Sequence, residues 1–486
     1  MRGRYVFTGV MALFLSCKLF GPEEKAEVDW EASKEKSEEA GRVLEEGLSR
    51  VRPEAPPEEA LAGLDLDQAM GLYEEALELD PSNSLAHFGM AITELLSILA
   101  DRRVQDAVDS LSSILEGLSV ESSVGALASS PIAFYGMARR AWPPGAAKPA
   151  IFRASDLQEV VEQEMLPGLG RALGHLEEVE KDEDFRVYVR TRSVQPLVKV
   201  LSGPEGGPVS LPEVDSLEVD LGEVYTLDAQ VRLARAFLLI LTSYNLDFDY
   251  RGSYELLRTE SDSLKLVYLR YLDEESSLLT LRSGGNPSRA KSDLLTALEK
   301  FGEAVAFIRA EDDPQEDDII KKQDLEALKE EIGEDAPEFL GDVETIEGLL
   351  AKVRQLLSEP LPVREDFDHD GEKEELLVNL SAWLDLPPQD LKAFLPYHRW
   401  YPENFGNDNF YDDLVLTDAQ LNPLGKGDPP FVLPDPSFGG IFPQFGSNEE
   451  FLSFFGMPLA SGPLPVDPLN RSGGKPPLLS SAGRTE

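Results

Sequence analysis

Apolar residues recur every three or four positions along much of the chain, a spacing that predicts amphipathic helices. The pattern predicts one helix from about Leu64 to Leu77, a second from Leu85 to Leu99 and a third from Arg102 to Leu118. The first two are separated by Asp80-Pro81-Ser82-Asn83, residues that end one helix and begin the next. The same spacing predicts further helices around residues 28–50, 169–179, 223–245, 294–308 and 340–358.

Strand-like alternation is scarce. Only Phe185–Val189 and Leu217–Leu221 alternate weakly, so the chain is expected to be all-α up to about residue 386. Residues 387–461 are instead rich in Pro, Gly, Asn, Asp and aromatic residues, which predicts loops. Two roles remain open for this region, packing of its rings against the helical body and an aromatic platform for a saccharide or peptide. The rings in question include Trp400, Tyr401, Phe438 and Phe442.

The segment QAMGLYEEALELDPSNSLAHFGMA, from Gln68 to Ala91, is similar to a tetratricopeptide repeat crossing from one unit into the next. The resemblance implies helical hairpins that stack into a solenoid, because no single hairpin buries its own apolar face. Departures occur at His87 and Glu94, where the family favours aromatic residues. The resemblance assigns the packing positions of the repeat to Ala69, Tyr73, Ala76 and Pro81.

The N-terminus has the layout of a secretory signal. Two arginines precede a mainly apolar run from Tyr5 to Leu15, which is shorter than the roughly 20 residues that a membrane-spanning helix needs. The run ends in Phe14-Leu15-Ser16-Cys17, which resembles a bacterial lipobox. The resemblance implies that residues 1–16 are removed and that Cys17 receives a lipid. An ordinary signal peptide and an uncleaved anchor are the alternatives.

Lys18 follows the cysteine instead of the aspartate that retains many lipoproteins in the inner membrane. By resemblance, the expected destination is therefore the outer membrane. Cys17 is also the only cysteine in the chain, so a lipidated protein has no thiol left for catalysis or a disulfide.

Composition and pattern together divide the chain into six parts. The expected parts are a lipoprotein-type signal peptide (1–16), an acidic linker with an N-terminal helix (17–62), tetratricopeptide-like repeats (63–120), a further helical region (121–386), the loop-rich aromatic region (387–461) and a disordered tail (462–486).

The chain is strongly acidic. Its 90 Asp and Glu residues outnumber 45 Lys and Arg residues, which gives a formal net charge of −45. Nucleic acids and anionic membrane surfaces are poor partners for such a chain, because neutralising phosphates requires clustered Lys and Arg. The acidic residues either solvate the surface or attract cations.

One short acidic motif resembles the start of a calcium-binding loop. Alternating carboxylates offer hard oxygen ligands, and Gly371 permits a tight turn. The motif departs from the EF-hand pattern at Lys373 and Leu377. The alternative is a solvated acidic turn that begins a helix at Glu372, since acidic residues stabilise a helix start without a metal. The candidate ligands for a structural calcium ion are Asp366, Asp368, Asp370 and Glu374.

Catalytic motifs are scarce. The four histidines lack zinc-protease spacing, and no nucleophile elbow or phosphate-binding loop is present. The sequence therefore favours a non-enzymatic protein, a scaffold anchored in the cell envelope by its lipid that binds another envelope protein or a peptide in a groove of its helices near residues 64–118. The alternative is a calcium-stabilised lipoprotein that binds a small ligand or saccharide. A carboxylate-dependent glycosidase is a third hypothesis.

Overall fold

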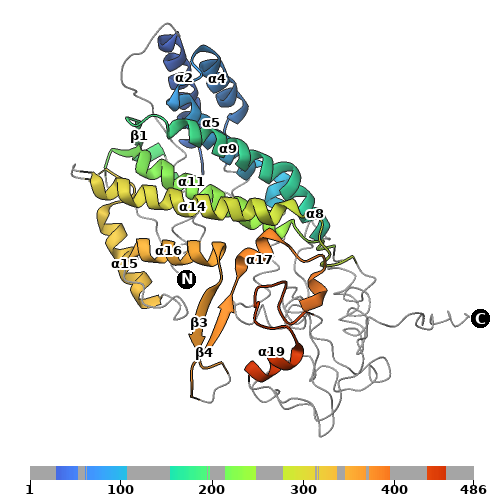
Figure 1. Cartoon of the computed structure of the whole chain (residues 1–486). Coiled ribbons are helices and arrows are strands. Elements are labelled where there is room, and N and C mark those ends of the chain that lie inside the picture. The colour runs from blue at the N-terminus through green and yellow to red at the C-terminus, as the bar shows by residue number, and fades with distance from the viewer. Residues whose placement is uncertain are drawn as a thin grey trace, which may run out of the picture.

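A computed structural model of the chain describes residues 29–52, 61, 63–106, 154–193, 195–196, 214–247, 277–311, 315, 317–335, 345–367, 371–394 and 435–455 (Figure 1). Helices account for 66% of these residues, which confirms the mainly helical fold. The longer helices are α2 (Trp30–Leu48), α4 (Leu66–Leu79), α5 (Ser84–Ala100), α9 (Leu166–Val179), α11 (Leu221–Leu241), α14 (Gly285–Ala310), α15 (Lys322–Asp335) and α16 (Ile346–Ser358). The shorter ones are α8 (Ala154–Val160), η2 (Val161–Met165), α17 (Leu380–Asp385), η4 (Leu391–Phe394) and α19 (Asn448–Phe454).

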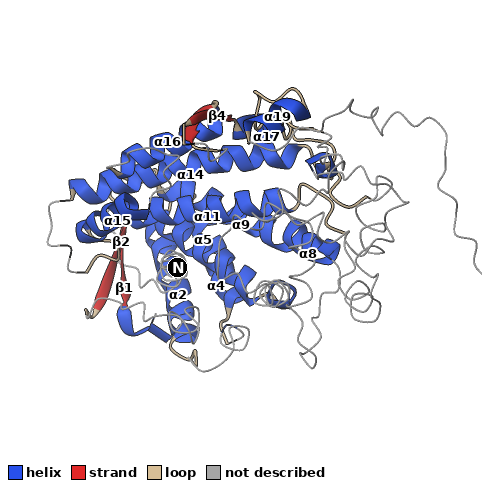
Figure 2. Ribbon diagram, turned by 90° about the horizontal axis from the view of Figure 1, so that it is seen from below, coloured by secondary structure: helices blue, strands red, loops and turns tan. Residues whose placement is uncertain are grey.

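The first helices begin where the sequence provides N-caps. The side chains of Asp29, Asp65 and Asn83 each accept a hydrogen bond from a backbone N–H in the first turn of α2, α4 and α5. Each of the helices α2, α4, α5, α9, α11 and α14 then packs against the next in that order (Figures 1 and 2). A tetratricopeptide solenoid remains a prediction, because this order of packing is shared by other helical arrays.

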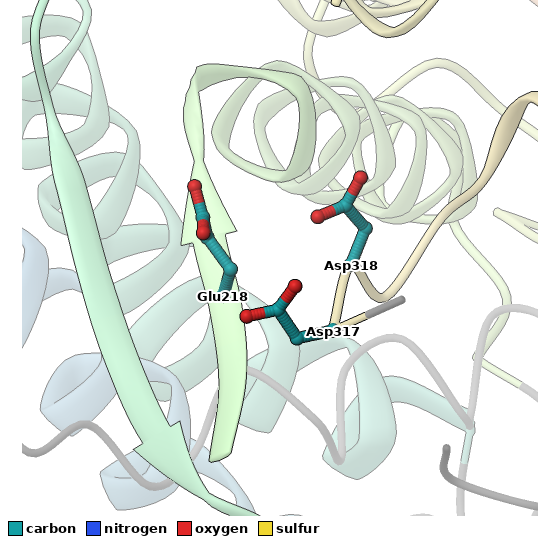
Figure 3. A group of neighbouring side chains, drawn as sticks. All are labelled: Glu218, Asp317 and Asp318. Carbon is teal, nitrogen blue, oxygen red and sulfur yellow. The ribbon is translucent and has the colours of Figure 1, made fainter. Parts of the chain in front are cut away.

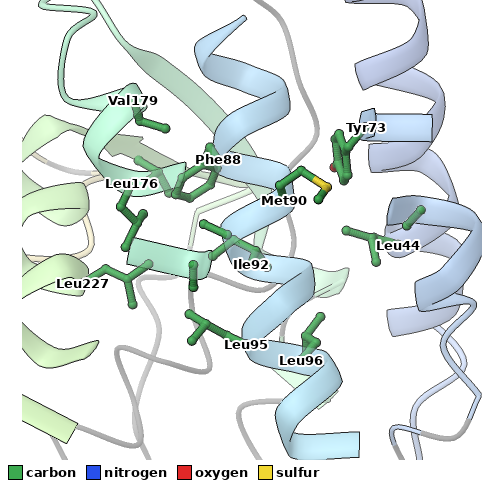
Figure 4. Packing of buried hydrophobic residues seen from close by; sticks show 14 of the residues in the cluster. Leu44, Tyr73, Phe88, Met90, Ile92, Leu95, Leu96, Leu176, Val179 and Leu227 are labelled. Atoms are coloured by element: carbon green, nitrogen blue, oxygen red, sulfur yellow. The ribbon is translucent and has the colours of Figure 1, made fainter. Parts of the chain in front are cut away.

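Helix α5 lies at the centre of the main hydrophobic core. Figure 4 shows Phe88 and Ile92 on the side of α5 that faces Leu176 and Leu227, whereas Met90 lies on the side that faces α4. Burial of each such side chain contributes about 1.5–3 kcal/mol. Because nearly every residue of α5 is buried, its side chains cannot line an exposed groove.

Helices α11 and α14 form an antiparallel pair. The start of α11 meets the end of α14 where Gly222 touches Ile308, and the opposite ends meet where Asn286 Nδ2 donates to Thr242 Oγ1. Between these ends, Arg235 pairs with the buried Asp293, and the nearest N–O distance is 2.5 Å. A buried ion pair contributes little net stability, but it disfavours any other alignment of the two helices.

Both segments with weak alternation form strands. β1 (Arg186–Arg190) pairs antiparallel with β2 (Ser216–Asp220), with Tyr188 opposite Glu218. A second antiparallel pair, β3 (Leu361–Glu365) with β4 (Glu374–Val378), was not predicted. The described part of residues 121–386 is therefore helical with two small sheets.

The C-terminal part packs phenylalanine rings against the second sheet. Phe445 is 3% exposed, and its ring lies 5.2 Å from the rings of both Phe451 and Phe454. Phe438 and Phe442, expected either to pack or to form a platform, are partly buried against this cluster. The described part of this loop-rich region also contains two short helices, η4 and α19, and Ser447 caps α19. Trp400 and Tyr401 lie outside the described residues.

Every helix among the described residues is too short or too polar to span a bilayer.

Candidate functional site

Six carboxylates meet where β2, α11 and α14 come together, and we call this group the carboxylate cluster. Its nucleus is a triad in which one carboxylate oxygen from each residue lies within 4.8 Å of the other two, formed by Glu218, Asp317 and Asp318 (Figure 3). Glu218 comes from β2, and the two aspartates come from a neighbouring segment. The other members are Asp220, Glu223 and Glu311.

Backbone contacts place the triad. The N–H of Glu218 donates to the carbonyl oxygen of Asp317 at 2.9 Å, and Glu218 forms a parallel bridge with Asp318. Asp317 and Asp318 therefore lie beside β2 through an isolated parallel bridge. Glu218 and Asp318 are each about 5% exposed, whereas Asp317 is half-buried.

The start of α11 supplies two more buried carboxylates. Asp220 Oδ1 accepts from the N–H of Gly222 at 2.8 Å, and Glu223 Oε2 accepts from the N–H of Asp220 at 3.2 Å, which makes a capping box. Glu223 Oε1 accepts from the N–H of Ile320. Glu223 thus ties the first turn of α11 to the segment beside β2.

Glu223 and Glu311 of the cluster have raised pKa values. Burial, followed by the neighbouring Asp220, raises the pKa of Glu223 well above its ordinary value. Burial, followed by a hydrogen bond to Asp220, raises the pKa of Glu311 to about 8. A hydrogen bond between two carboxyl groups requires a proton on one of them, which is why the neighbouring Asp220 raises the pKa of Glu311.

Two basic side chains contact members of the cluster among the described residues. Arg186 on β1 pairs with Glu218 through an Nε–Oε1 contact of 2.6 Å. Lys322 Nζ donates to the backbone carbonyl of Glu311. Glu218, Asp317 and Asp318 offer the carboxylate oxygens that a hard cation such as Ca²⁺ prefers.

The sequence carried a partial signal for this cluster. The acidic run EDDPQEDD, from Glu311 to Asp318, follows the C-terminus of a helix, where the helix dipole disfavours negative charge. The motif D-x-x-E at Asp220 to Glu223 is also a recognisable capping box. Their meeting depends on the antiparallel packing of α11 and α14, which local patterns do not specify.

No protein-family model, curated protein or solved structure matches the chain.

The predicted calcium loop lies between β3 and β4. Asp366 Oδ2 accepts from the N–H of Gly371 at 3.0 Å, and Glu374 Oε2 accepts from the N–H of Phe367 at 2.9 Å. Gly371 has a φ of +96°, which explains the glycine. The alternative of a helix beginning at Glu372 was wrong, because β4 begins at Glu374. Asp368 and Asp370 lie outside the described residues, so a calcium site there remains a prediction.

Three of the four positions assigned to tetratricopeptide packing are buried, and the fourth is exposed. Ala69, Tyr73 and Ala76 are each 0% exposed, whereas Pro81 is exposed in the turn before α5. Glu94, which replaces an aromatic residue of the family, accepts two hydrogen bonds from Arg171 of α9 at 2.6 and 2.8 Å. Cys17 lies outside the described residues.

Proposed function

We propose that the protein is a non-enzymatic helical scaffold, anchored in the cell envelope by a lipid on Cys17, that binds another envelope protein. The observation that carries the proposal is the ordered packing of successive helices from α2 to α14. Such arrays offer long surfaces that suit a partner segment better than a small molecule.

The partner surface is assigned to α2 and α4, which lie at one end of the array (Figure 1). Both helices bury one face and leave the other accessible. The accessible positions are mainly acidic, so the partner is expected to present lysine or arginine. These positions are Glu31, Glu35, Glu46, Asp67, Glu74, Glu75 and Glu78.

Crosslinking in intact cells tests the proposal. The tagged protein is crosslinked, purified and analysed by mass spectrometry. Recovery of one envelope protein in near-stoichiometric amount supports the scaffold function. A clean protein without a partner contradicts it and directs attention to a ligand for the aromatic region and the loop around Asp366.

Cys17→Ala is the matched control for the anchor. We expect this variant to leave the membrane fraction and to lose crosslinking, because the lipid concentrates the scaffold where its partner lies. A variant that still fractionates with membranes contradicts the lipid anchor. The purified unsubstituted protein and the purified Cys17→Ala variant should bind the isolated partner with equal affinity. This comparison separates the effect of the lipid anchor from recognition of the partner.

The second candidate, a calcium-stabilised lipoprotein that binds a small ligand or saccharide, draws on the loop between β3 and β4. Calcium titration monitored by calorimetry tests it, with Asp366→Asn as the control variant. Micromolar binding that this variant abolishes favours the second candidate, whereas absence of binding removes its main support.

A further inference from the structure

Two histidines from different helices meet at the interface between α5 and α9. Nδ1 of His87 lies 2.9 Å from Nδ1 of His175, and the ring centroids are 5.2 Å apart. Nε2 of His87 lies 2.9 Å from the carbonyl oxygen of Pro81. Because a carbonyl oxygen only accepts hydrogen bonds, Nε2 of His87 carries a proton.

This geometry limits how many protons the pair holds. When both rings are neutral, Nδ1 of His87 is an acceptor, so His175 donates through its own Nδ1. The pair can bind one further proton and still keep a single hydrogen between the two Nδ1 atoms, so the hydrogen bond persists. When both rings are protonated, two N–H groups face each other at 2.9 Å, and the contact becomes repulsive.

We propose that the His87–His175 contact is a proton-sensitive latch, which holds α9 against α5 at neutral pH and loosens this interface in acid. The latch lies beside the core, since Phe88 follows His87 and Leu176 follows His175. His175 is half-buried, so protons from solvent reach it. Loosening α9 therefore uncovers apolar surface on α5.

Other charged groups around the pair modulate the latch. Glu94 of α5 and Arg171 of α9 pair across the same interface, and Glu178 of α9 pairs with Lys181 at 2.6 Å. Asp182, after α9, accepts a hydrogen bond from Ser84 at the start of α5. The Glu94–Arg171 pair is therefore a second contact between α5 and α9, independent of the two histidine rings.

The sign of the pH dependence follows from His175. Burial, followed by repulsion from His87, lowers the pKa of His175 below its ordinary value, against the opposing effect of Glu94. A histidine with a lowered folded pKa stabilises the fold above its unfolded pKa of about 6.5, and this contribution is lost as the pH falls below that value.

A metal ion does not fit the pair as well as protons do. Tetrahedral zinc holds its nitrogen ligands about 3.3 Å apart and takes at least three protein ligands. The two Nδ1 atoms are closer than that. Within the described residues, the potential three-ligand group lies at Glu218, away from these histidines.

Hydrogen exchange of the full chain tests the latch at pH 7.5 and pH 5.0, with His175→Asn as the matched variant. The asparagine amide still donates to Nδ1 of His87 but takes up no proton. We expect the amides of α5 and α9 to lose more protection at pH 5.0 in the unsubstituted protein than in the variant. Equal losses in both proteins would overturn the proposal.

A ring titration by NMR gives a second readout in His87→Gln. The glutamine amide still donates a hydrogen bond to the carbonyl oxygen of Pro81. It carries no positive charge to repel a proton on His175. We expect the pKa of His175 to rise in this variant. An unchanged pKa would overturn the latch, and so would a shift of the ring signals in the unsubstituted protein on adding one equivalent of Zn²⁺.

Discussion

The ring of Tyr73 rests directly on the backbone of Gly89, at the contact between α4 and α5. A Cβ atom on Gly89 would lie 2.1 Å from Cζ of this ring, which is itself 0% exposed and has no room to move. We expect Gly89→Ala to lower the free energy of unfolding by about 3 kcal/mol, measured by denaturant titration.

Gly71→Ala on α4 is the control for that substitution. Nothing lies within 4 Å of a Cβ atom at Gly71. Because alanine favours a helix over glycine, this variant should be neutral or slightly more stable, by up to about 1 kcal/mol. Similar destabilisation by both variants would contradict the close contact at Gly89.

Glu311 should make the protein less stable at alkaline than at acidic pH. Its folded pKa of about 8 lies above the ordinary value of 4.5, so its contribution is present below pH 4.5 and is lost as the pH rises to 8. We expect Glu311→Gln to raise the free energy of unfolding by about 1 kcal/mol at pH 8 and by little at pH 5. The effect is small because the side chain is partly exposed and solvent screens its charge.

Thermal unfolding at the two pH values measures this effect, and the exposed Glu359→Gln serves as control. A glutamine that destabilises the protein equally at both pH values would show that Glu311 holds no proton. The sign is opposite to that of the histidine latch, so global stability and local exchange in α5 and α9 separate the two effects.

Among the elements, the helices were predictable because their apolar spacing extends over several turns. The break at Asp80-Pro81-Ser82-Asn83 marked the end of α4 and the start of α5. The β3–β4 hairpin was not predictable in this way. Each strand has only five residues, and the phenylalanines that cover it come from residues 438–455. The carboxylate cluster likewise depends on contacts between distant segments.

Because the β3–β4 hairpin is covered by phenylalanines from residues 438–455, removing one of these rings should destabilise it. Phe445→Ala should destabilise the hairpin by about 3–5 kcal/mol, because Phe445 is buried among four other phenylalanines. Hydrogen exchange should accelerate in β3 and β4 but not in α5. The control is Phe237→Ala on α11, where the side chain is 62% exposed. Uniform acceleration throughout the chain would contradict a separate C-terminal cluster.

For the whole molecule, the net charge of −45 predicts a response to salt. Screening shortens the reach of repulsion among the carboxylates, from about 30 Å at 0.01 M salt to about 10 Å at 0.1 M. The thermal midpoint should therefore rise by several degrees over this range. A midpoint that falls would mean that the ion pairs, such as Arg232–Asp228, outweigh the repulsion.

Site-specific photo-crosslinking in intact cells tests the scaffold function most directly. A photoreactive residue replaces Glu35 on α2 or Glu74 on α4, with the likewise exposed Ala351 on α16 and Glu449 on α19 as controls. We predict that both test positions crosslink to one envelope protein and that the controls do not. Crosslinks of equal yield from all four positions, or from none, would contradict a partner surface on α2 and α4.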